Sequence, residues 1–448
     1  MRFRLLQGIL RATVHRDQAR EVREQRRLRA GDVRVAQRHS FERAIVFANR
    51  MALESEGYRQ RLRRDGIRLP ITRQTWDTLP ILTKSDFRQD TGSWFGTAVG
   101  ARNVLWTFTS GSTGEPFEFP LTHASQIAEA AGMELNLEAL GWRPPMRRAT
   151  IKLEPPQPKG LHKLYGALVG GREIGFRAAD MRLEQVGAMV ERLRRERISF
   201  LRGYAASVYL FADAVSQRGL HCPIPLIVTL GEGLSPRQAK VIERAFQGKV
   251  YRDYGGSEAM HMGFECREQS GYHLNLAQFH LEVLRDGRPV GPGEAGDIVV
   301  TTFRNSAMPL VRYRIGDIGR RPMSDAACAC GNRFPMLAEV LGRSADLAVT
   351  ANGYMINLNL LDAIFRYAFE HVTQYQMIQK EPDRFDVLWV ARHDRAAEHL
   401  PPLQQELAAM TGGAVKFDWQ QVTWIPPERS GKHRGFIPLR PHGTSISA

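Results

Sequence analysis

The sequence predicts an α/β protein: a large N-terminal α/β domain with a parallel sheet and a small β unit, and a small α+β C-terminal domain. Helical and strand-like segments alternate from residue 181 to residue 246, which is typical of a parallel sheet covered by helices. Apolar and polar residues alternate over 272–302, which indicates hairpins of a smaller β unit. Beyond residue 342 mixed helices and strands follow, so we place the domains at 1–342 and 343–448.

The composition is that of a soluble globular protein. The chain has 448 residues, of which 43% are hydrophobic and 24% are charged, enough for at least two domains with a large core. No apolar run approaches the roughly 18 residues of a transmembrane segment, and the N-terminus does not resemble a signal peptide. Because four cysteines make no disulfide framework in a chain of this length, we expect a cytoplasmic protein.

The net charge of +15 comes mainly from arginine, which gathers at residues 20–29, 61–64 and 192–197. Such a field favours anionic partners, namely a nucleotide, CoA, nucleic acid or an acidic membrane face. Arginine on solvated helix faces explains the same clusters without any partner. Since no aromatic residues are interleaved with these clusters, we expect no specific nucleic-acid partner.

The first half of the chain begins with helices and then changes to strands. Residues 1–70 predict Arg-rich helices, because their apolar residues recur at helical spacing. A short buried strand is expected at 104–108, followed by a polar loop and more strand at 117–120. A helix is expected at 123–140, where Gly141 closes it.

The second half predicts the parallel sheet and the C-terminal domain. Ser235 is expected to cap a helix over 237–246, with Pro236 at its first position. Ligands of parallel sheets bind beyond the carboxyl ends of the strands, so Tyr204 and Ala205 are expected in a substrate pocket. The remaining elements are helices at 181–198, 206–218, 358–369 and 403–411 and strands at 200–204, 226–230, 374–379, 385–390 and 422–425.

The loop after the first strand is built to hold phosphate. Glycine lets the backbone approach a ligand closely, and successive backbone N–H groups in such a turn bind anions, with hydroxyl donors adding to them. The loop differs from the usual P-loop because no lysine follows its last glycine. A Ser/Gly-rich surface turn is the alternative. The predicted phosphate-binding residues are Thr109, Ser110, Gly111, Ser112, Thr113 and Gly114.

This loop is the first of five motifs that resemble, in order, those of the adenylate-forming superfamily. The others are Asp253–Glu258, Pro309–Asp317, Gly342–Asp346 and Arg429–Arg434. The chain is most similar to the phenylacetate–CoA ligase and capsular-polysaccharide (CapK-like) ligase family, and the resemblance extends along nearly the whole chain. It implies the adenylate-forming enzyme fold, with a mobile C-terminal domain that pivots at Asp346.

The resemblance implies a nucleotide site in the N-terminal domain. It places Tyr254, with Gly255 after it, against the adenine, Glu232 at the adenine-side turn and Ser257 near the phosphates. Asp317 would accept hydrogen bonds from the ribose hydroxyls.

Three charged residues would act on the reacting phosphates. Glu258 would hold Mg²⁺, for which a carboxylate is a suitable hard ligand. Arg343 would face the ribose and phosphates. Lys432 would bridge the carboxylate substrate and the α-phosphate, where a mobile ammonium stabilises developing charge. The sequence departs from the superfamily at Thr350, where many members carry lysine.

A second set of residues has the chemistry of a metal site. Cys266, His273, Cys328 and Cys330 would suit a closed tetrahedral Zn²⁺ site, although their spacing is not the familiar pair of Cys-x-x-Cys. Some phenylacetate–CoA ligase relatives show the same arrangement, which implies a structural zinc. Scattered buried cysteines are the alternative.

The function that the resemblance implies is ATP- and Mg²⁺-dependent activation of a small carboxylic acid to an acyl-adenylate. An aromatic acid fits Tyr204 in the pocket, a short aliphatic or hydroxy acid stays open as the substrate, and CoA is the commonest acceptor in the family. An amine, a sugar hydroxyl or a carrier protein stay open as acceptors, and a homodimer is a further expectation. Two rival hypotheses are a phosphotransferase and a catalytically degenerate, Arg-rich scaffold or polyanion binder.

Overall fold

The computed structural model divides into two compact units. The first takes residues 1–148, 158–173 and 251–340, and the second takes 149–157, 174–250 and 341–448. The predicted boundary after residue 342 lies close to the last of these borders and stays a prediction. The residues that the structure describes are 16–88, 90–96, 104–109, 117–142, 147–152, 173–178, 184–231, 233–256, 258–324, 327–343, 348–349, 355–356, 370–411, 413, 415–427, 435–437 and 439.

The described part of the first unit begins with the helices α2 (Arg16–Ala30), α3 (Val33–Glu54) and α4 (Glu56–Arg64), in the region where the sequence predicts helices. Ser55 ends α3 and caps α4, because its hydroxyl oxygen accepts from the backbone N–H of Tyr58 while its hydroxyl donates to the carbonyl oxygen of Trp94. A serine at such a junction satisfies backbone donors that the helix leaves open. Three short elements follow, η1 (Trp76–Thr78), α5 (Lys84–Arg88) and η2 (Thr91–Trp94).

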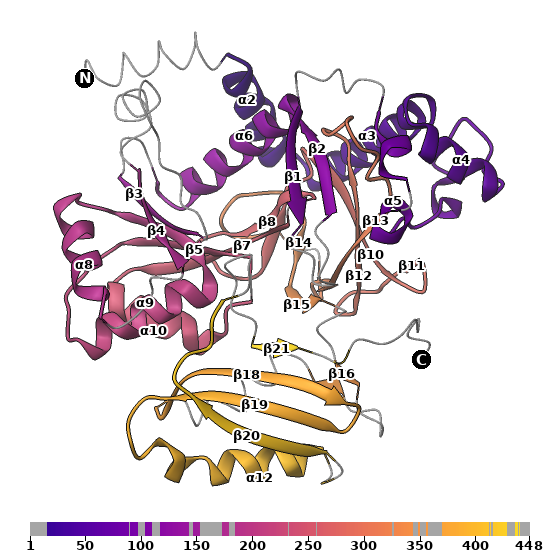
Figure 1. The fold of residues 1–448 in the computed structure, drawn as a ribbon. Coiled ribbons are helices and arrows are strands. Elements are labelled where there is room, and N and C mark those ends of the chain that lie inside the picture. Colours follow the sequence, from indigo (N-terminus) through magenta and orange to yellow (C-terminus); the bar gives the residue numbers. More distant parts are fainter. Residues whose placement is uncertain are drawn as a thin grey trace, which may run out of the picture. The chain divides into compact units, whose positions relative to one another are not determined.

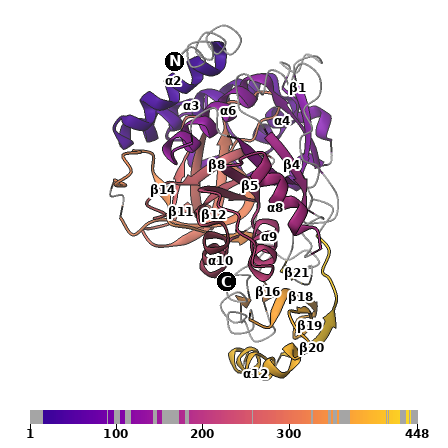
Figure 2. The same ribbon diagram turned by 90° about the vertical axis from the view of Figure 1, so that its left-hand side faces the viewer.

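Helix α6 (His123–Ala139) lies beside α2, as Figures 1 and 2 both show. The side chain of Gln25 in α2 is buried and donates to the carbonyl oxygen of Ala128 in α6 at 2.8 Å. At the rim of this contact Arg26 pairs with Glu138 at 2.6 Å. Thr122 caps α6, so the helix predicted at 123–140 is confirmed.

The strand predicted at 104–108 exists but is not buried. Strands β1 (Val104–Thr109) and β2 (Phe117–Thr122) form an antiparallel hairpin that is a sheet of its own. In this hairpin Leu105 is 52% and Trp106 is 47% exposed, and Trp106 packs edge-on against Phe95. The prediction of burial was therefore wrong, because an apolar run cannot show whether a strand lies in a core or in a two-stranded hairpin.

The small β unit that the sequence predicts belongs to a five-stranded sheet, in which β10 pairs antiparallel with β11 and β12, and β12 pairs antiparallel with β13. Its order is β11-β10-β12-β13-β15. Asp286 and Gly287 join β10 to β11 with φ values of 52° and 75°, as a tight hairpin turn requires. The strands are β10 (Phe279–Arg285), β11 (Arg288–Pro289), β12 (Ala295–Thr302), β13 (Tyr313–Arg320) and β15 (Glu339–Arg343).

Four more strands of the first unit pair antiparallel in the order β14-β9-β8-β7. They are β7 (Lys249–Gly256), β8 (Met260–Glu265), β9 (Tyr272–Leu274) and β14 (Met336–Leu337).

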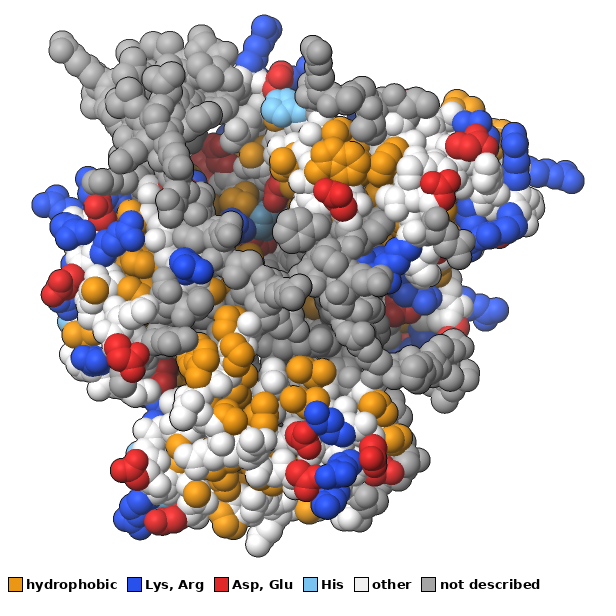
Figure 3. Space-filling view, viewed as in Figure 1, with side chains coloured by type: hydrophobic (Ala, Val, Ile, Leu, Met, Phe, Trp, Pro, Cys, Tyr) orange, Lys and Arg blue, Asp and Glu red, His pale blue; other side chains and the backbone are white. Residues whose placement is uncertain are grey.

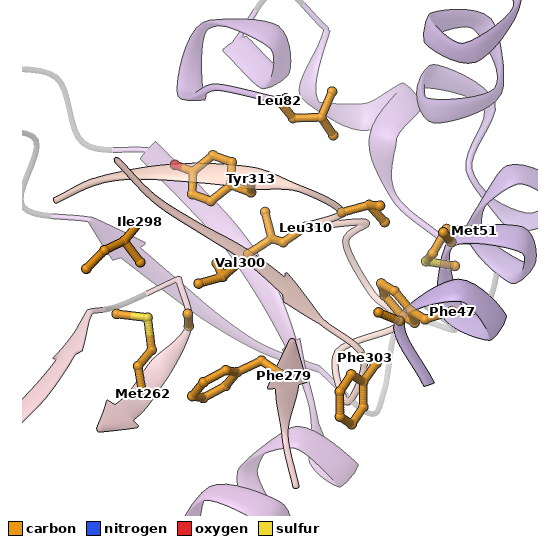
Figure 4. Packing of buried hydrophobic residues seen from close by; sticks show 14 of the residues in the cluster. Phe47, Met51, Leu82, Met262, Phe279, Ile298, Val300, Phe303, Leu310 and Tyr313 are labelled. Atoms are coloured by element: carbon orange, nitrogen blue, oxygen red, sulfur yellow. The ribbon is translucent and has the colours of Figure 1, made fainter. Parts of the chain in front are cut away.

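The core of the first unit joins the N-terminal helices to the five-stranded sheet. Figure 4 shows Phe47 and Met51 of α3 near Phe303, while Leu82 lies near Tyr313 of β13. The backbone of Leu82 also pairs with β13, since its N–H donates to Arg312 and its carbonyl accepts from Arg314. This pairing gives the Pro-Ile-Leu-Thr-Lys segment at 80–84 a structural role.

Arg312 is buried in this core and fastens three segments of the chain. Its side chain is 1% exposed and faces both carboxylate oxygens of Glu282 in β10, at 3.1 and 3.2 Å. The remaining terminal nitrogen donates to the carbonyl oxygens of Trp76, Asp77 and Leu79 at 3.0–3.3 Å. Burial raises the pKa of the Glu282 carboxyl, an effect that Arg312 opposes. All guanidinium nitrogens thus have acceptors, as a buried cation requires.

The second unit contains the parallel pair that the sequence predicts. Its strands follow the order β6-β5-β3-β4, and β5 and β6 pair parallel, with Phe200 opposite Leu226. Ser235 and Gln238 form a capping box at the start of α10, and Pro236 stands at the first helical position, as expected. The elements are β3 (Arg148–Lys152), β4 (Glu173–Arg177), α8 (Val186–Arg195), β5 (Phe200–Tyr204), α9 (Ala205–Gln217), β6 (Leu226–Leu230) and α10 (Pro236–Phe246).

The C-terminal part of the second unit is α+β, as predicted. Its sheet has the order β20-β19-β18-β21, in which β18 and β19 are antiparallel while the outer pairs are parallel. The elements are β16 (Ala348–Val349), β17 (Met355–Ile356), β18 (Val372–Glu381), β19 (Arg384–Ala391), η6 (Ala396–His399), α12 (Pro401–Met410), β20 (Lys416–Val422) and β21 (Phe436–Ile437).

One C-terminal strand was predicted in the wrong place. The sequence favours 422–425 for its apolar residues, but the strand is β20, which pairs residue for residue with β19. It stands at the edge of the sheet and is mostly polar, so its pairing was invisible in the hydrophobic pattern. The helix predicted at 358–369 lies outside the described residues. Within the described part, every helix falls short of the length or hydropathy that a membrane span requires.

We predict that Arg312→Met destabilises the protein by about 3–5 kcal/mol, because it leaves Glu282 and three carbonyl groups buried without their donor. Urea unfolding followed by circular dichroism measures the change. Arg314→Met is the matched control two residues further along the chain, where a 41% exposed arginine pairs with Asp297 in a contact worth below about 1 kcal/mol. Equal effects of the two substitutions would contradict the role of Arg312.

Candidate nucleotide and metal site

The structure brings two sequence-distant predicted residues into contact in the first unit. The hydroxyl of Tyr254 in β7 donates to Asp317 Oδ2 in β13 at 2.9 Å. Tyr254 is buried and packs edge-on against Tyr272, with ring centroids 6.0 Å apart. This contact fixes the ring of Tyr254 relative to the Asp317 carboxylate, so one residue of each motif is held beside the other.

A bulge in β13 places Asp317 at this position. Along the pairing with β12, Asp297 faces Ile318 and Val299 faces Arg314, so three residues of β13 stand opposite one residue of β12. Within the bulge Gly316 has a φ of 90°, a conformation that favours glycine. Bulges of this kind redirect side chains and are common beside active sites.

Glu258 lies at the turn between β7 and β8. A methyl group placed on Gly256 would lie 3.5 Å from Glu258 Oε2 and 3.6 Å from Ile315 Cδ1. The carboxylate is therefore folded over the end of β7, near the bulge that precedes Asp317. A partly exposed carboxylate beside a candidate nucleotide contact fits a Mg²⁺ ligand, because Mg²⁺ takes one or two protein carboxylates and completes its shell with phosphates and water.

The hairpin that carries Glu258 depends on Gly255. Gly255 stands opposite His261, after a register shift at Tyr254. A Cβ at Gly255 would lie 2.1 Å from the carbonyl oxygen of Met260, so no side chain fits between the two strands here. Met260 closes the turn with a φ of 55°.

The four predicted metal ligands also come together in the first unit. One ligand atom from each of Cys266, His273, Cys328 and Cys330 lies within 4.8 Å of the others. Cys266 Sγ is 3.6 Å from Cys328 Sγ, and Cys330 Sγ is 3.3 Å from His273 Nε2. Two sulfurs on one tetrahedral Zn²⁺ would stand about 3.8 Å apart, so the spacing fits the ion.

The histidine and the thiols have the environment of metal ligands. His273 is fully buried, and its Nδ1 lies 3.1 Å from the carbonyl oxygen of Phe334, a contact that leaves Nε2 free to bind a metal. Burial raises the pKa of Cys266 to about 12 and also raises the pKa of Cys330. At Cys328 burial acts in the same direction, but hydrogen bonds from neighbouring groups outweigh it and lower the pKa. A divalent cation would deprotonate all three thiols.

The structure does not show the other predicted nucleotide and pocket residues beside Tyr254, Asp317 and Glu258. The backbone of Thr109 pairs with Phe117 and so closes β1 and β2 before the predicted phosphate loop, and Arg343 ends β15. In the second unit Tyr204 precedes α9, and Ala205 is buried in that unit's core. The predicted residues outside the described part are Ser110, Gly111, Ser112, Thr113, Gly114, Glu232, Ser257, Asp346 and Lys432.

Some arginines of the clusters pair with acidic side chains. In α4 Arg59 pairs with Glu56 and Arg61 pairs with Asp65. On the face drawn in Figure 3, basic side chains lie mainly near the margins, with acidic side chains among them. Such pairs are what solvated helix faces show.

Two family models match the chain. The model described as AMP-binding enzyme matches residues 28–306, and the one described as CapK C-terminal domain matches residues 348–438. The fold and the motifs that meet at Tyr254 and Asp317 define an adenylate-forming enzyme of the α/β class. The chain belongs to the AMP-binding enzyme family, and its C-terminal part matches the domain of CapK proteins.

The chain is also similar in sequence to two named proteins whose names fit this family. The chain is 28% identical over 298 residues to phenylacetate-coenzyme A ligase of Thermus thermophilus, which is 62% of this chain and 63% of that protein. It is 25% identical over 430 residues to Protein CapK of Staphylococcus aureus, covering 92% of this chain and 90% of that protein.

The fold is that of a solved acyl-CoA ligase. A structure of 2-hydroxyisobutyryl-CoA ligase in the postadenylation state, in complex with R3-HIB-AMP, has a TM-score of 0.74 at 18% identity. The match covers 92% of each chain. At this identity the similarity establishes the fold alone.

We predict that Gly255→Ala destabilises the protein by about 1–3 kcal/mol, because its methyl group forces β7 away from the Met260 carbonyl. Gly256→Ala is the matched control, since a methyl group there makes only ordinary contacts. Thermal unfolding by calorimetry compares the two. The close approach would be contradicted by a Gly255→Ala protein as stable as Gly256→Ala.

Proposed function

We propose that this protein activates a carboxylic acid with ATP. The carboxylate attacks the α-phosphate, an acyl-adenylate and pyrophosphate form, and an acceptor nucleophile then displaces AMP. The observation that carries the proposal is the hydrogen bond between Tyr254 and Asp317, with Glu258 on the adjoining turn. Residues from two separate family motifs meet there.

The residues take complementary roles in this reaction. Tyr254, with Gly255 and Glu232, binds the adenine side, and Asp317 accepts from the ribose hydroxyls. Ser257 and the predicted phosphate loop hold the phosphates. These assignments are supported by the order of the family motifs and, for Tyr254 and Asp317, by their contact.

Three charged residues act on the reacting groups. Glu258 is the ligand for Mg²⁺, which offsets the phosphate charge. Arg343 faces the ribose and phosphates. Lys432 bridges the substrate carboxylate and the α-phosphate after the C-terminal domain has turned about Asp346. A cation placed where charge develops lowers the barrier for the transfer.

CoA is the acceptor that we propose, with an aromatic acid as substrate. The relative named phenylacetate-coenzyme A ligase supports both choices. An amine, a sugar hydroxyl or a carrier-protein thiol is the second candidate, and the similarity to Protein CapK along most of the chain supports it. Each acceptor leaves a different product from the same acyl-adenylate.

Pyrophosphate release with a panel of carboxylic acids tests the proposal. Aromatic acids, short aliphatic acids and hydroxy acids are each supplied with MgATP, and AMP is measured in parallel. We expect acid-dependent pyrophosphate and, after CoA is added, AMP and an acyl-CoA. Release of ADP would favour a phosphotransferase, and the absence of any acid-dependent product would favour a degenerate scaffold.

We predict that Lys432→Ala lowers acyl-adenylate formation by about 100-fold or more, the size of effect that one lost transition-state contact can have. Transfer from supplied acyl-adenylate should survive, because that half-reaction would use the other placement of the C-terminal domain. Pyrophosphate release and thioester formation are measured separately on the purified variant. An equal loss in both half-reactions would refute the role of Lys432.

We also propose that Cys266, His273, Cys328 and Cys330 bind a structural Zn²⁺. The ligand set closes a tetrahedral shell without a position for water, as structural zinc sites do. Cys266 follows β8 and Cys328 lies far along the chain, so the ion would crosslink the unfolded chain across a long loop. The support is the proximity of four suitable donors.

The zinc proposal predicts about one Zn²⁺ per chain in protein purified without added metal. Cys328→Ser should lose the ion and lower the melting temperature, because a ligand that binds only the folded state stabilises it. Cys222→Ser is the control, since Cys222 is buried in the second unit outside the cluster. Elemental analysis and thermal unfolding report the result. The zinc proposal would be contradicted by purified protein that contains no zinc, or by a Cys328→Ser protein that is as stable as the parent.

A further inference from the structure

A histidine lies between two carboxylates on the hairpin that carries Glu258. His261 Nδ1 in β8 is 2.6 Å from Asp253 Oδ2 in β7, and His261 Nε2 is 3.2 Å from Glu129 Oε1 in α6. The side chain of His261 is 12% exposed, that of Asp253 is 9% exposed and that of Glu129 is 21% exposed. The cluster is therefore largely withdrawn from water, where a broken contact costs more than it does at a surface.

His261 contacts a different carboxylate with each of its ring nitrogens. Both nitrogen–oxygen distances, 2.6 Å and 3.2 Å, lie within the range of a hydrogen bond. Hydrogen bonds to carboxylates are charge-assisted and hold their partners in a defined direction.

The bridge joins two elements that matter for the nucleotide. In the β7–β8 hairpin His261 stands opposite Gly255, and the next pair, Gly256 with Met260, closes the turn that contains Glu258. On the other side, Glu129 belongs to α6, which begins directly after β2. Strand β2 is the strand that leaves the predicted phosphate loop.

We propose that His261 is a positioning residue for bound MgATP. Through Asp253 and Glu129 it sets the Glu258 turn relative to the helix that follows the phosphate loop. The carboxylate of Glu258, the proposed Mg²⁺ ligand, is thereby held in one place on the β7–β8 turn. This inference rests on the proposed function, because it requires Glu258 to bind Mg²⁺.

The proposal predicts an effect on the metal complex and not on the nucleotide alone. Glutamine in place of His261 can donate to one carboxylate only, so one side of the bridge opens. Glu129→Gln keeps an oxygen that can accept from His261 but removes the carboxylate charge, so it weakens the bridge on the α6 side and leaves the contact between His261 and Asp253 in place. A displaced Glu258 turn weakens the metal contact, whereas the adenine and ribose contacts of Tyr254 and Asp317 stay.

Calorimetric titration of the full-length protein tests this. ATP is titrated with Mg²⁺ and, separately, with a chelator and no metal, into the wild type, His261→Gln and Glu129→Gln. We expect both variants to bind MgATP about tenfold more weakly, the usual scale for coupled neighbours, and to bind metal-free ATP as the wild type does. Glu138→Gln is the control, because Glu138 lies on α6 like Glu129 but pairs with Arg26 of α2, and this variant should bind both forms normally.

The outcomes separate the alternatives. Unchanged MgATP binding in both variants overturns the inference, and so does an equal loss for metal-free ATP, which a merely structural role would give. A raised KM for the carboxylic acid with normal MgATP affinity also overturns it, since His261 would then belong to the acid pocket. If His261→Gln fails to fold, Glu129→Gln decides. A wild type that binds no ATP overturns the proposed function itself.

Discussion

The first unit depends on one buried cation. Arg312 connects the segment that follows the N-terminal helices to two strands of the five-stranded sheet, through Glu282 and three backbone carbonyl groups. A buried guanidinium is tolerated only where its donors are used, and its planar fork suits a carboxylate bound by two contacts. These contacts fix the start of β13, the strand in which Asp317 lies five residues after Arg312. The position of a candidate ribose ligand is thus determined by a residue that would not touch the nucleotide.

The candidate site is formed by two irregularities in otherwise regular sheets. The bulge at Ile315, Gly316 and Asp317 turns one carboxylate out of β13, and the hairpin after Gly256 places another at its turn. In a regular strand both side chains would point to the face of the sheet that the alternation of the strand gives them. Glycine permits both departures, at Gly316 through its backbone conformation and at Gly255 through the space it leaves for Met260.

The cysteine and histidine cluster adds a second constraint on the same strands. Cys266 directly follows β8, whose other end begins the hairpin of Glu258, and His273 lies in β9 beside it. A metal at this point would hold β8 and β9 to the segment of Cys328 and Cys330. The hairpin would then be held at one end by the metal and at the other by the bridge of His261.

The sequence by itself determined the fold class and the family, and it named the candidate site residues. Periodic helices, the Ser235–Pro236 helix start and the Asp286–Gly287 turn are local signals, because a few neighbouring residues decide each of them. The same patterns failed where a distant partner decides. Burial of β1 and the place of β20 depend on which strand lies alongside, and residues near in sequence do not encode that.

Only the tertiary structure could bring Tyr254 to Asp317, or His261 between Glu129 and Asp253. These contacts join residues far apart in the chain, and their distances follow from packing and from a bulge that has no clear pattern in sequence. The motifs named Tyr254, Asp317 and Glu258, whereas Glu129 and His261 belong to no motif and look like ordinary charged residues. A sequence records which chemical groups are available, and the folded chain decides which of them meet.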